Sequence, residues 1–191
     1  MPERYENRGP RDSEVSHGDP IDGYQLVSYQ ENGSLVYAYR RAPPTADYST
    51  TNLNLLTSHQ NAHTLDRHGP DISDEALIRR ANEGIAPDGS TRGGPRPDGT
   101  YFSPIMSSRF DSPQELQAAL RHTREGTEAF ANGIVNPNNP NRMTVTYSST
   151  DGRTFGSGVA RGTTELTPLH SVTAQYENVD GVWQLVTMHP S

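Results

Sequence analysis

The sequence contains no cysteine and no lysine among its 191 residues. Without thiols, a disulfide scaffold, a thiol nucleophile and a thiolate metal site are excluded, so any chemistry must come from histidine, arginine, carboxylates and hydroxyls. No apolar run approaches the roughly 18 residues that cross a bilayer. The opening MPERYENRGPRDSEV also lacks the apolar stretch of a signal peptide. We therefore expect a protein that acts away from membranes and has no cleavable signal peptide.

Apolar residues are scarce, at 31% of the chain, while glycine and proline number 17 and 15. This composition raises the entropic cost of ordering the backbone, so we expect part of the chain to be unstructured and one domain to form from the rest. The net charge is −7, and all 16 basic residues are arginine. An acidic balance disfavours a broad basic surface for nucleic acid but allows local clusters of arginine.

The first 56 residues have the composition of a tail followed by a small module. Residues 1–22 show no periodicity and are predicted to be a disordered tail. From 24 to 40, runs of Val, Leu and Tyr flank Asn32-Gly33, a dipeptide favoured in two-residue hairpin turns, which predicts a β-hairpin. Pro43-Pro44 cannot continue a helix or a strand ladder. We therefore divide the chain into the tail, a hairpin module with linker at 23–56, and a main domain at 57–191.

Helices are predicted in the first half of the main domain. The pattern at 58–68 is weakly helical, whereas a serine cap, acidic residues in the first turn and a glycine stop predict a helix over 73–83. Residues 87–99 have the composition of a loop. Ser112 and Glu115 form a capping-box pattern at the start of an amphipathic helix predicted over 113–132.

The last third of the chain is rich in strand-forming residues. Strands are predicted at 143–148, 154–160, 171–177 and 182–188, with turns at Asp151-Gly152 and Asp180-Gly181. Helices followed by an antiparallel meander predict the α+β class. We expect the last strand to be central or nearly so in the sheet. Side chains two apart share a face of a strand, so Thr187 and His189 are expected to lie side by side, with about 7 Å between their Cα atoms.

Seven histidines are present, and most are interpreted as solvated surface residues, including His122 and His170. His63 and His68 in HTLDRH look like a metal pair, but zinc-binding helices place their histidines one turn apart to share a face. Here the interval is five residues, so we predict no metal site.

Four segments occur in a recognisable order: HTLDRHG with the arginine-bearing helix DEALIRRAN, then SSRF, then GRTFGSGVARG, and finally LVTMHP. From about residue 61 to 191, this order resembles the RNase A-like toxin domain at the C-terminal end of bacterial contact-dependent inhibition proteins and other polymorphic toxins. The resemblance implies a pancreatic-ribonuclease-like fold, with N-terminal helices followed by an antiparallel curved sheet and, in this chain, no disulfides.

The resemblance also implies site residues. It makes His68, Arg79 and Thr187 catalytic. The family's terminal tyrosine falls on His189, a departure that supplies a second candidate catalytic histidine. Two more residues, His63 and Arg80, are candidates for substrate binding. His63 has an alternative role, a structural hydrogen bond at the helix start. Arg80 takes the phosphate role in place of Arg79 if the helix is rotated by about one residue.

These residue types suit RNA cleavage without a metal or cofactor. The reaction needs a base for the 2′-hydroxyl proton, an acid for the departing 5′-oxygen and a cation for the charge on phosphorus. Histidine can be acid or base near neutrality because its unperturbed pKa is about 6.5. Arginine offers a permanent fork for phosphate oxygens. We expect an endoribonuclease that leaves a 2′,3′-cyclic phosphate.

Residues 60–191 hold 11 arginines against 15 carboxylates, so RNA binding would depend on a local groove and on salt. Single-stranded RNA or tRNA is the expected substrate, since an unpaired 2′-hydroxyl can reach in-line geometry. The resemblance further implies a cognate immunity protein, a dedicated secretion route and action in the target-cell cytoplasm, and we expect a monomer.

Two alternatives stay open. An ADP-ribosyltransferase-like toxin would use similar residue types, but the sequence lacks the Glu-x-Glu element of that class. A non-catalytic effector that binds a host or competitor protein would keep the scaffold, with the tyrosine-to-histidine departure marking loss of activity.

Overall fold

The computed structural model describes residues 5–6, 15–21, 24–41, 49 and 51–191. Within these residues the chain is a mixture of short helices and largely antiparallel sheets, which confirms the α+β class. The described part of the chain contains no helix long and apolar enough to cross a membrane.

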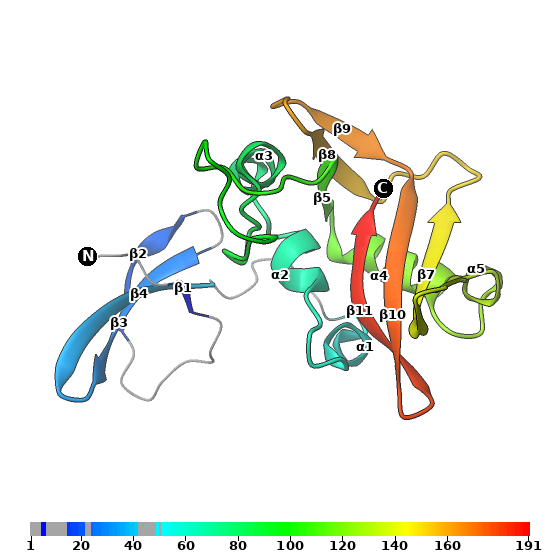
Figure 1. Ribbon diagram of the computed structural model, residues 1–191, viewed down its shortest axis with the longest axis horizontal. Coiled ribbons are helices and arrows are strands. Elements are labelled where there is room, and N and C mark those ends of the chain that lie inside the picture. The colour runs from blue at the N-terminus through cyan, green and yellow to red at the C-terminus, as the bar shows by residue number, and fades with distance from the viewer. Residues whose placement is uncertain (1–4, 7–14, 22–23, 42–48, 50) are drawn as a thin grey trace.

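An N-terminal sheet has the strand order β1-β4-β3-β2 and lies at one end of Figure 1. Its strands are β1 (Tyr5–Glu6), β2 (Val15–Ile21), β3 (Tyr24–Glu31) and β4 (Ser34–Arg41). The predicted hairpin at Asn32-Gly33 is confirmed, because both residues adopt positive φ angles, 52° and 77°. β1 and β2 lie within the segment 1–22 that was predicted as a disordered tail, and β2 pairs with β3 of the hairpin module. Residues 1–4, 7–14 and 22 of that segment lie outside the described residues.

Three helices follow: α1 (Leu53–Thr57), α2 (Thr64–His68) and α3 (Asp74–Glu83). The prediction for α3 is confirmed, since the Ser73 hydroxyl accepts from the Ala76 N–H and Gly84 ends the helix at φ 78°. α2 covers only the end of the weak pattern at 58–68. Leu56 of α1 packs into the main core, while the division at residue 57 stays a prediction.

The single helix predicted over 113–132 is wrong. The chain forms α4 (Pro113–Thr123) and α5 (Glu128–Ala131), separated by an extended Arg124 and by Gly126 at φ 86°. Thr127, which lies inside the predicted helix, instead caps α5 by accepting from the Phe130 N–H. The capping box of α4 is half formed, because Glu115 turns away from the helix start to pair with Arg153. A local cap and a left-handed glycine therefore override the helical periodicity.

The strands that were predicted to form one meander belong to two separate sheets. One contains β6 (Ile134–Asn136), β7 (Asn139–Ser148), β10 (Ser171–Val179) and β11 (Val182–Pro190) in the order β11-β10-β7-β6. The other contains β5 (Met106–Phe110), β8 (Gly156–Ala160) and β9 (Leu166–Leu169) in the order β5-β8-β9. β8 pairs with β5, a strand that the sequence did not predict, rather than with its neighbour β7. β11 lies at an end of its sheet, so the expected central position is wrong.

The main core lies between α4 and the sheet that contains β11, and α4 runs behind that sheet in Figure 1. Leu116 and Leu120 of α4 are buried against Val145, Val172 and Met188 of the strands. Met188 faces this core, so its neighbours in β11, Thr187 and His189, face the opposite side, where α2 packs against β11. α3 packs on the neighbouring strands β5 and β8.

The contact of β5, β8 and β11 leaves no room for a side chain at residue 156. A Cβ atom on Gly156 would overlap the Arg109 carbonyl of β5 and reach within 2.6 Å of Pro190 Cγ. We expect Gly156→Ala to lower the free energy of unfolding by about 1–3 kcal/mol through overpacking. Gly94→Ala is the matched control, because its Cβ would meet open space. Urea denaturation of both variants measures this, and equal stabilities would contradict the packing.

Candidate functional site

α2 is fastened to the last strand at its first residues. The His63 N–H donates to the Val186 carbonyl at 3.1 Å, and the Met188 N–H donates to the Thr64 hydroxyl at 2.9 Å. A helix of five residues is not stable alone, so these bonds hold it in place. They bring His68, the last residue of α2, against the end of β11.

His68 is buried and held at both ring nitrogens. Its Nδ1 lies 2.7 Å from the Ser108 carbonyl of β5, and its Nε2 lies 3.3 Å from a guanidinium nitrogen of Arg80. The carbonyl can only accept and the guanidinium can only donate, so Nδ1 carries the proton and Nε2 presents its lone pair. Burial lowers the pKa of His68 well below the usual 6.5, with Arg80 and His189 lowering it further. His68 is therefore a neutral base.

His189 stacks on His68, with ring centroids 5.0 Å apart and an interplanar angle of 30°. Its Nδ1 lies 3.1 Å from the Pro190 carbonyl, which leaves Nε2 for another partner. A bulge at Val186 shifts the alternation of β11, so that Thr187 pairs with Gln175 and Leu185 with Tyr176. Burial lowers the pKa of His189, and the hydrogen bond to Pro190 partly offsets this.

Arg80 is the cation of this cluster. The same guanidinium nitrogen that contacts His68 donates to the Arg67 carbonyl at 3.4 Å. Among the described residues, Arg80 forms no ion pair with a carboxylate, because the nearby Asp88 pairs with Arg67 at 2.6 Å. Burial, followed by the charge of Arg67, lowers the pKa of Arg80 to about 10. The site therefore holds a partly buried positive charge that no described carboxylate contacts directly, although the charge of Asp88 acts on it.

Arg79, predicted as the catalytic arginine, does not join the cluster. Its exposed side chain pairs with Glu83 one turn along α3 at 3.4 Å. Leu77 and Ala81 form the buried stripe of α3. Arg80 follows Leu77 by three residues and lies beside this stripe, whereas Arg79 follows it by two and points away. The orientation of α3 thus selects Arg80 for the role expected of Arg79.

Thr187 lies on the same face of β11 as His189, as predicted. It is buried, and its hydroxyl has no hydrogen-bond partner, a property shared in the described residues with the Ser107 hydroxyl. A buried hydroxyl without a partner costs about 1–3 kcal/mol. A ligand atom that accepts from Thr187 would remove this cost.

His63 is at the rim of the cluster and caps α2 through its backbone rather than its ring. Its Nδ1 lies 2.8 Å from the Asn61 carbonyl, which agrees with the structural alternative for this residue. Burial is the main cause that lowers the pKa of His63, while Asn61 raises it. Substrate binding by His63 stays a prediction.

Sequence reasoning missed the residues that support the site. The Ser108 carbonyl accepts from His68, and the Ser108 hydroxyl donates at 2.7 Å to the Pro190 carbonyl, which also lies against His189. Ser108 thereby links both histidines. The only sequence signal was its place in SSRF. Asp88, which forms an ion pair with Arg67, lies in a loop, and no sequence pattern pointed to it.

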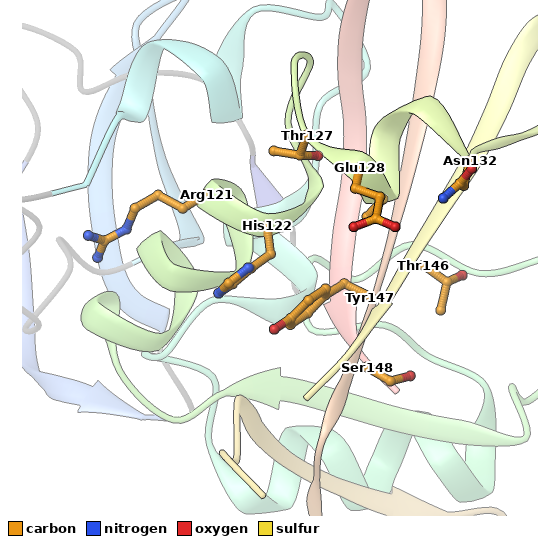
Figure 2. Close-up of a pocket in the computed structure, with 9 residues that line it drawn as sticks. Arg121, His122, Thr127, Glu128, Asn132, Thr146, Tyr147 and Ser148 are labelled. Carbon is orange, nitrogen blue, oxygen red and sulfur yellow. The ribbon is translucent and has the colours of Figure 1, made fainter. Parts of the chain in front are cut away.

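The described residues contain no group of three or more His, Cys, Asp or Glu side chains placed to hold a metal ion. A separate hollow of about 350 Å³ lies between α4, α5 and β7 (Figure 2), and none of the predicted site residues lines it. Its His122 and Tyr147 rings stack at 4.1 Å, so they cover one another, and Arg121 points away from them. The predicted site residues therefore meet at the His68 cluster and not at this hollow.

No family model matches the chain, and no curated protein matches it. Among solved structures, the chain is similar to the CdiA-CT/CdiI complex from Y. kristensenii 33638. The TM-score is 0.43 and the identity 16%, over 68% of this chain and 98% of that chain. Similarity at this level bears on neither the fold nor the activity.

The buried histidines make stability depend on pH. His68 and His189 have folded pKa values below 6.5, so the unfolded chain binds more protons when the pH falls through that value. We expect the free energy of unfolding to decrease from pH 7.5 to 5.5, by at most about 1.4 kcal/mol per pH unit for each histidine. His68→Gln should flatten this dependence in urea denaturation. The same slope in both proteins would contradict a neutral His68.

Proposed function

We propose that this protein is an endoribonuclease that cleaves RNA by attack of the 2′-hydroxyl, without a metal ion. The observation that carries the proposal is the meeting of His68, His189 and Arg80 from α2, β11 and α3. Two histidines and a cation are the groups that this reaction requires.

We assign His68 as the base, because it is the histidine that is held in the neutral form. Its Nε2 lone pair is defined by the Ser108 and Arg80 contacts, and its pKa is the more strongly lowered of the two histidines. The hydrogen bond of His189 to Pro190 uses Nδ1 and leaves Nε2 for the substrate, so His189 serves as the acid. A bound phosphate raises the pKa of His189 by its negative charge, so the acid becomes protonated when substrate is present. Two titratable groups with different environments support this division of roles.

When the substrate binds, the Arg80 guanidinium turns from His68 Nε2 to the phosphate, which frees the Nε2 lone pair. His68 Nε2 then takes the 2′-hydroxyl proton, the 2′-oxygen forms a bond to phosphorus, and the bond from phosphorus to the 5′-oxygen breaks. Protonated His189 gives its proton to the departing 5′-oxygen. Arg80 stabilises the charge on the phosphoryl oxygens, and the Thr187 hydroxyl donates to a phosphoryl oxygen or a base edge. The products are a 2′,3′-cyclic phosphate and a 5′-hydroxyl.

Single-stranded RNA or the unpaired parts of tRNA are the proposed substrates, because the 2′-hydroxyl must move in line with the bond that breaks. The order of HTLDRHG, SSRF and LVTMHP supports a place among the secreted bacterial toxins, with a cognate immunity protein and action in the target-cell cytoplasm.

The proposal is tested by incubating the protein with a fluorescent RNA in EDTA. We expect cleavage that leaves a cyclic phosphate, and a loss of about 10²- to 10⁴-fold in rate for His68→Ala and for His189→Ala. His170→Ala is the control, because His170 is exposed and lies outside the cluster. No cleavage by the parent at several salt concentrations and pH values would leave a non-catalytic effector as the better reading.

Arg80 and Arg79 provide an internal comparison on one helix. We expect Arg80→Ala to lower the cleavage rate by about 10²- to 10³-fold, since it removes the cation at the reacting phosphate. Arg79→Ala removes the same charge from an exposed ion pair and should stay within about threefold of the parent. Initial rates on one short RNA measure both. The reverse order would restore Arg79 as the catalytic arginine.

A further inference from the structure

Three arginines surround one exposed aromatic ring outside the catalytic cluster. The guanidinium carbons of Arg92, Arg96 and Arg161 lie 4.8, 5.5 and 5.7 Å from the centroid of Phe102. The Phe102 residue is 44% exposed, and all three arginines are exposed. In a chain of net charge −7, this is a local concentration of positive charge on an aromatic platform.

The cluster is assembled from two distant segments. Arg92, Arg96 and Phe102 belong to the loop after α3, and Arg161 belongs to the turn after β8. The Arg161 guanidinium donates to the Ser103 and Pro104 carbonyls, which holds the turn against the loop. The fold therefore fixes this position for Arg161.

Carboxylates pair with several other described arginines but not with these three. Five arginines in the main part of the chain form ion pairs: Arg67, Arg79, Arg109, Arg142 and Arg153. Among the described residues, no carboxylate forms an ion pair with the three arginines at Phe102. Asp98 is close enough to Arg96 to feel its charge, but its carboxylate accepts from the Thr100 N–H and hydroxyl. The cluster thus keeps its charge for an outside partner.

The cluster also adjoins the catalytic site along α3. The Tyr101 N–H donates to the Glu83 carbonyl at 2.8 Å, and the Gly84 N–H donates to the Arg80 carbonyl at 3.1 Å. These bonds place the Phe102 loop at the end of the helix whose last turn carries Arg80. A strand bound at Arg80 could continue onto this surface.

We propose that Phe102, Arg92, Arg96 and Arg161 bind the single-stranded RNA substrate beyond the phosphate that is cleaved. The arginine forks bind backbone phosphates and the ring stacks on a base, the combination by which proteins hold single strands. This inference rests on the proposed ribonuclease function. It identifies the local groove that an acidic ribonuclease needs.

Binding is measured first with the whole protein and a fluorescent 2′-O-methyl oligonucleotide of about 20 nucleotides, which keeps its phosphates but lacks the attacking hydroxyl. For the Arg92→Gln, Arg96→Gln double variant we expect the slope of log Kd against log salt to fall by about 1.4, for two lost contacts to a single strand. Within the described part of the chain neither side chain forms a hydrogen bond or an ion pair, so we expect the double variant to fold as the parent does. Phe102→Ala should weaken binding by about 5- to 150-fold.

The matched control is the Arg121→Gln, Arg124→Gln double variant, which removes the same charge at the end of α4, on the other side of the domain (Figure 1). It should keep the slope of the parent. Equal affinity and slope in the Arg92, Arg96 variant and the parent would overturn the inference and leave these arginines for an acidic protein partner.

Cleavage assays with two substrates distinguish a failure of this inference from a failure of the proposed ribonuclease function. A dinucleoside monophosphate has only the phosphate that is cut, so the Arg92, Arg96 variant should cleave it at the parent rate while KM for a long RNA rises. An equal loss on both substrates would overturn a separate binding surface. A parent protein that binds the oligonucleotide through these residues but cleaves neither RNA would contradict the ribonuclease and support the surface alone.

Discussion

The site depends on the hydrogen bonds that fasten α2 to the end of β11. The contacts from His63 to Val186 and from Met188 to Thr64 hold a single helical turn against an edge strand. The Ser108 hydroxyl of β5 joins a third element to this pair by donating to the Pro190 carbonyl. Because the sheet supplies the rigidity that so short a helix lacks, two histidines far apart in the chain stack as neighbours.

Burial then determines the chemistry of this pair. His68 has a carbonyl on one side and a guanidinium on the other, which specifies its tautomer and keeps it neutral. Several positive or potentially positive groups share a partly desolvated space, and Asp88 is engaged by Arg67. The repulsion between these groups raises the free energy of the protein alone. A bound anion would offset this repulsion, which is a common property of sites that bind phosphate.

Arginines in this acidic chain fall into two groups. Some are held by carboxylates at the surface, such as Arg153 by Glu115 and Arg142 by Glu177. Other described arginines form no ion pair, among them Arg80 and the three around Phe102. Net charge therefore says little about the partner of this protein, because the distribution of unpaired arginine decides where an anion is attracted.

Local signals in the sequence determined the elements whose causes lie within a few residues. Asn32-Gly33 specified a hairpin, Ser73 and Gly84 bounded α3, and strand alternation placed Thr187 and His189 on one face. The tertiary structure decided the rest. The pairing of β8 with β5 and the choice of Arg80 over Arg79 arise from packing between distant segments. So do the role of Ser108 and the gathering of arginines at Phe102. Capping and turn geometry act through neighbours in the chain, whereas these contacts exist only after loops of many residues close, and no local pattern encodes their partners.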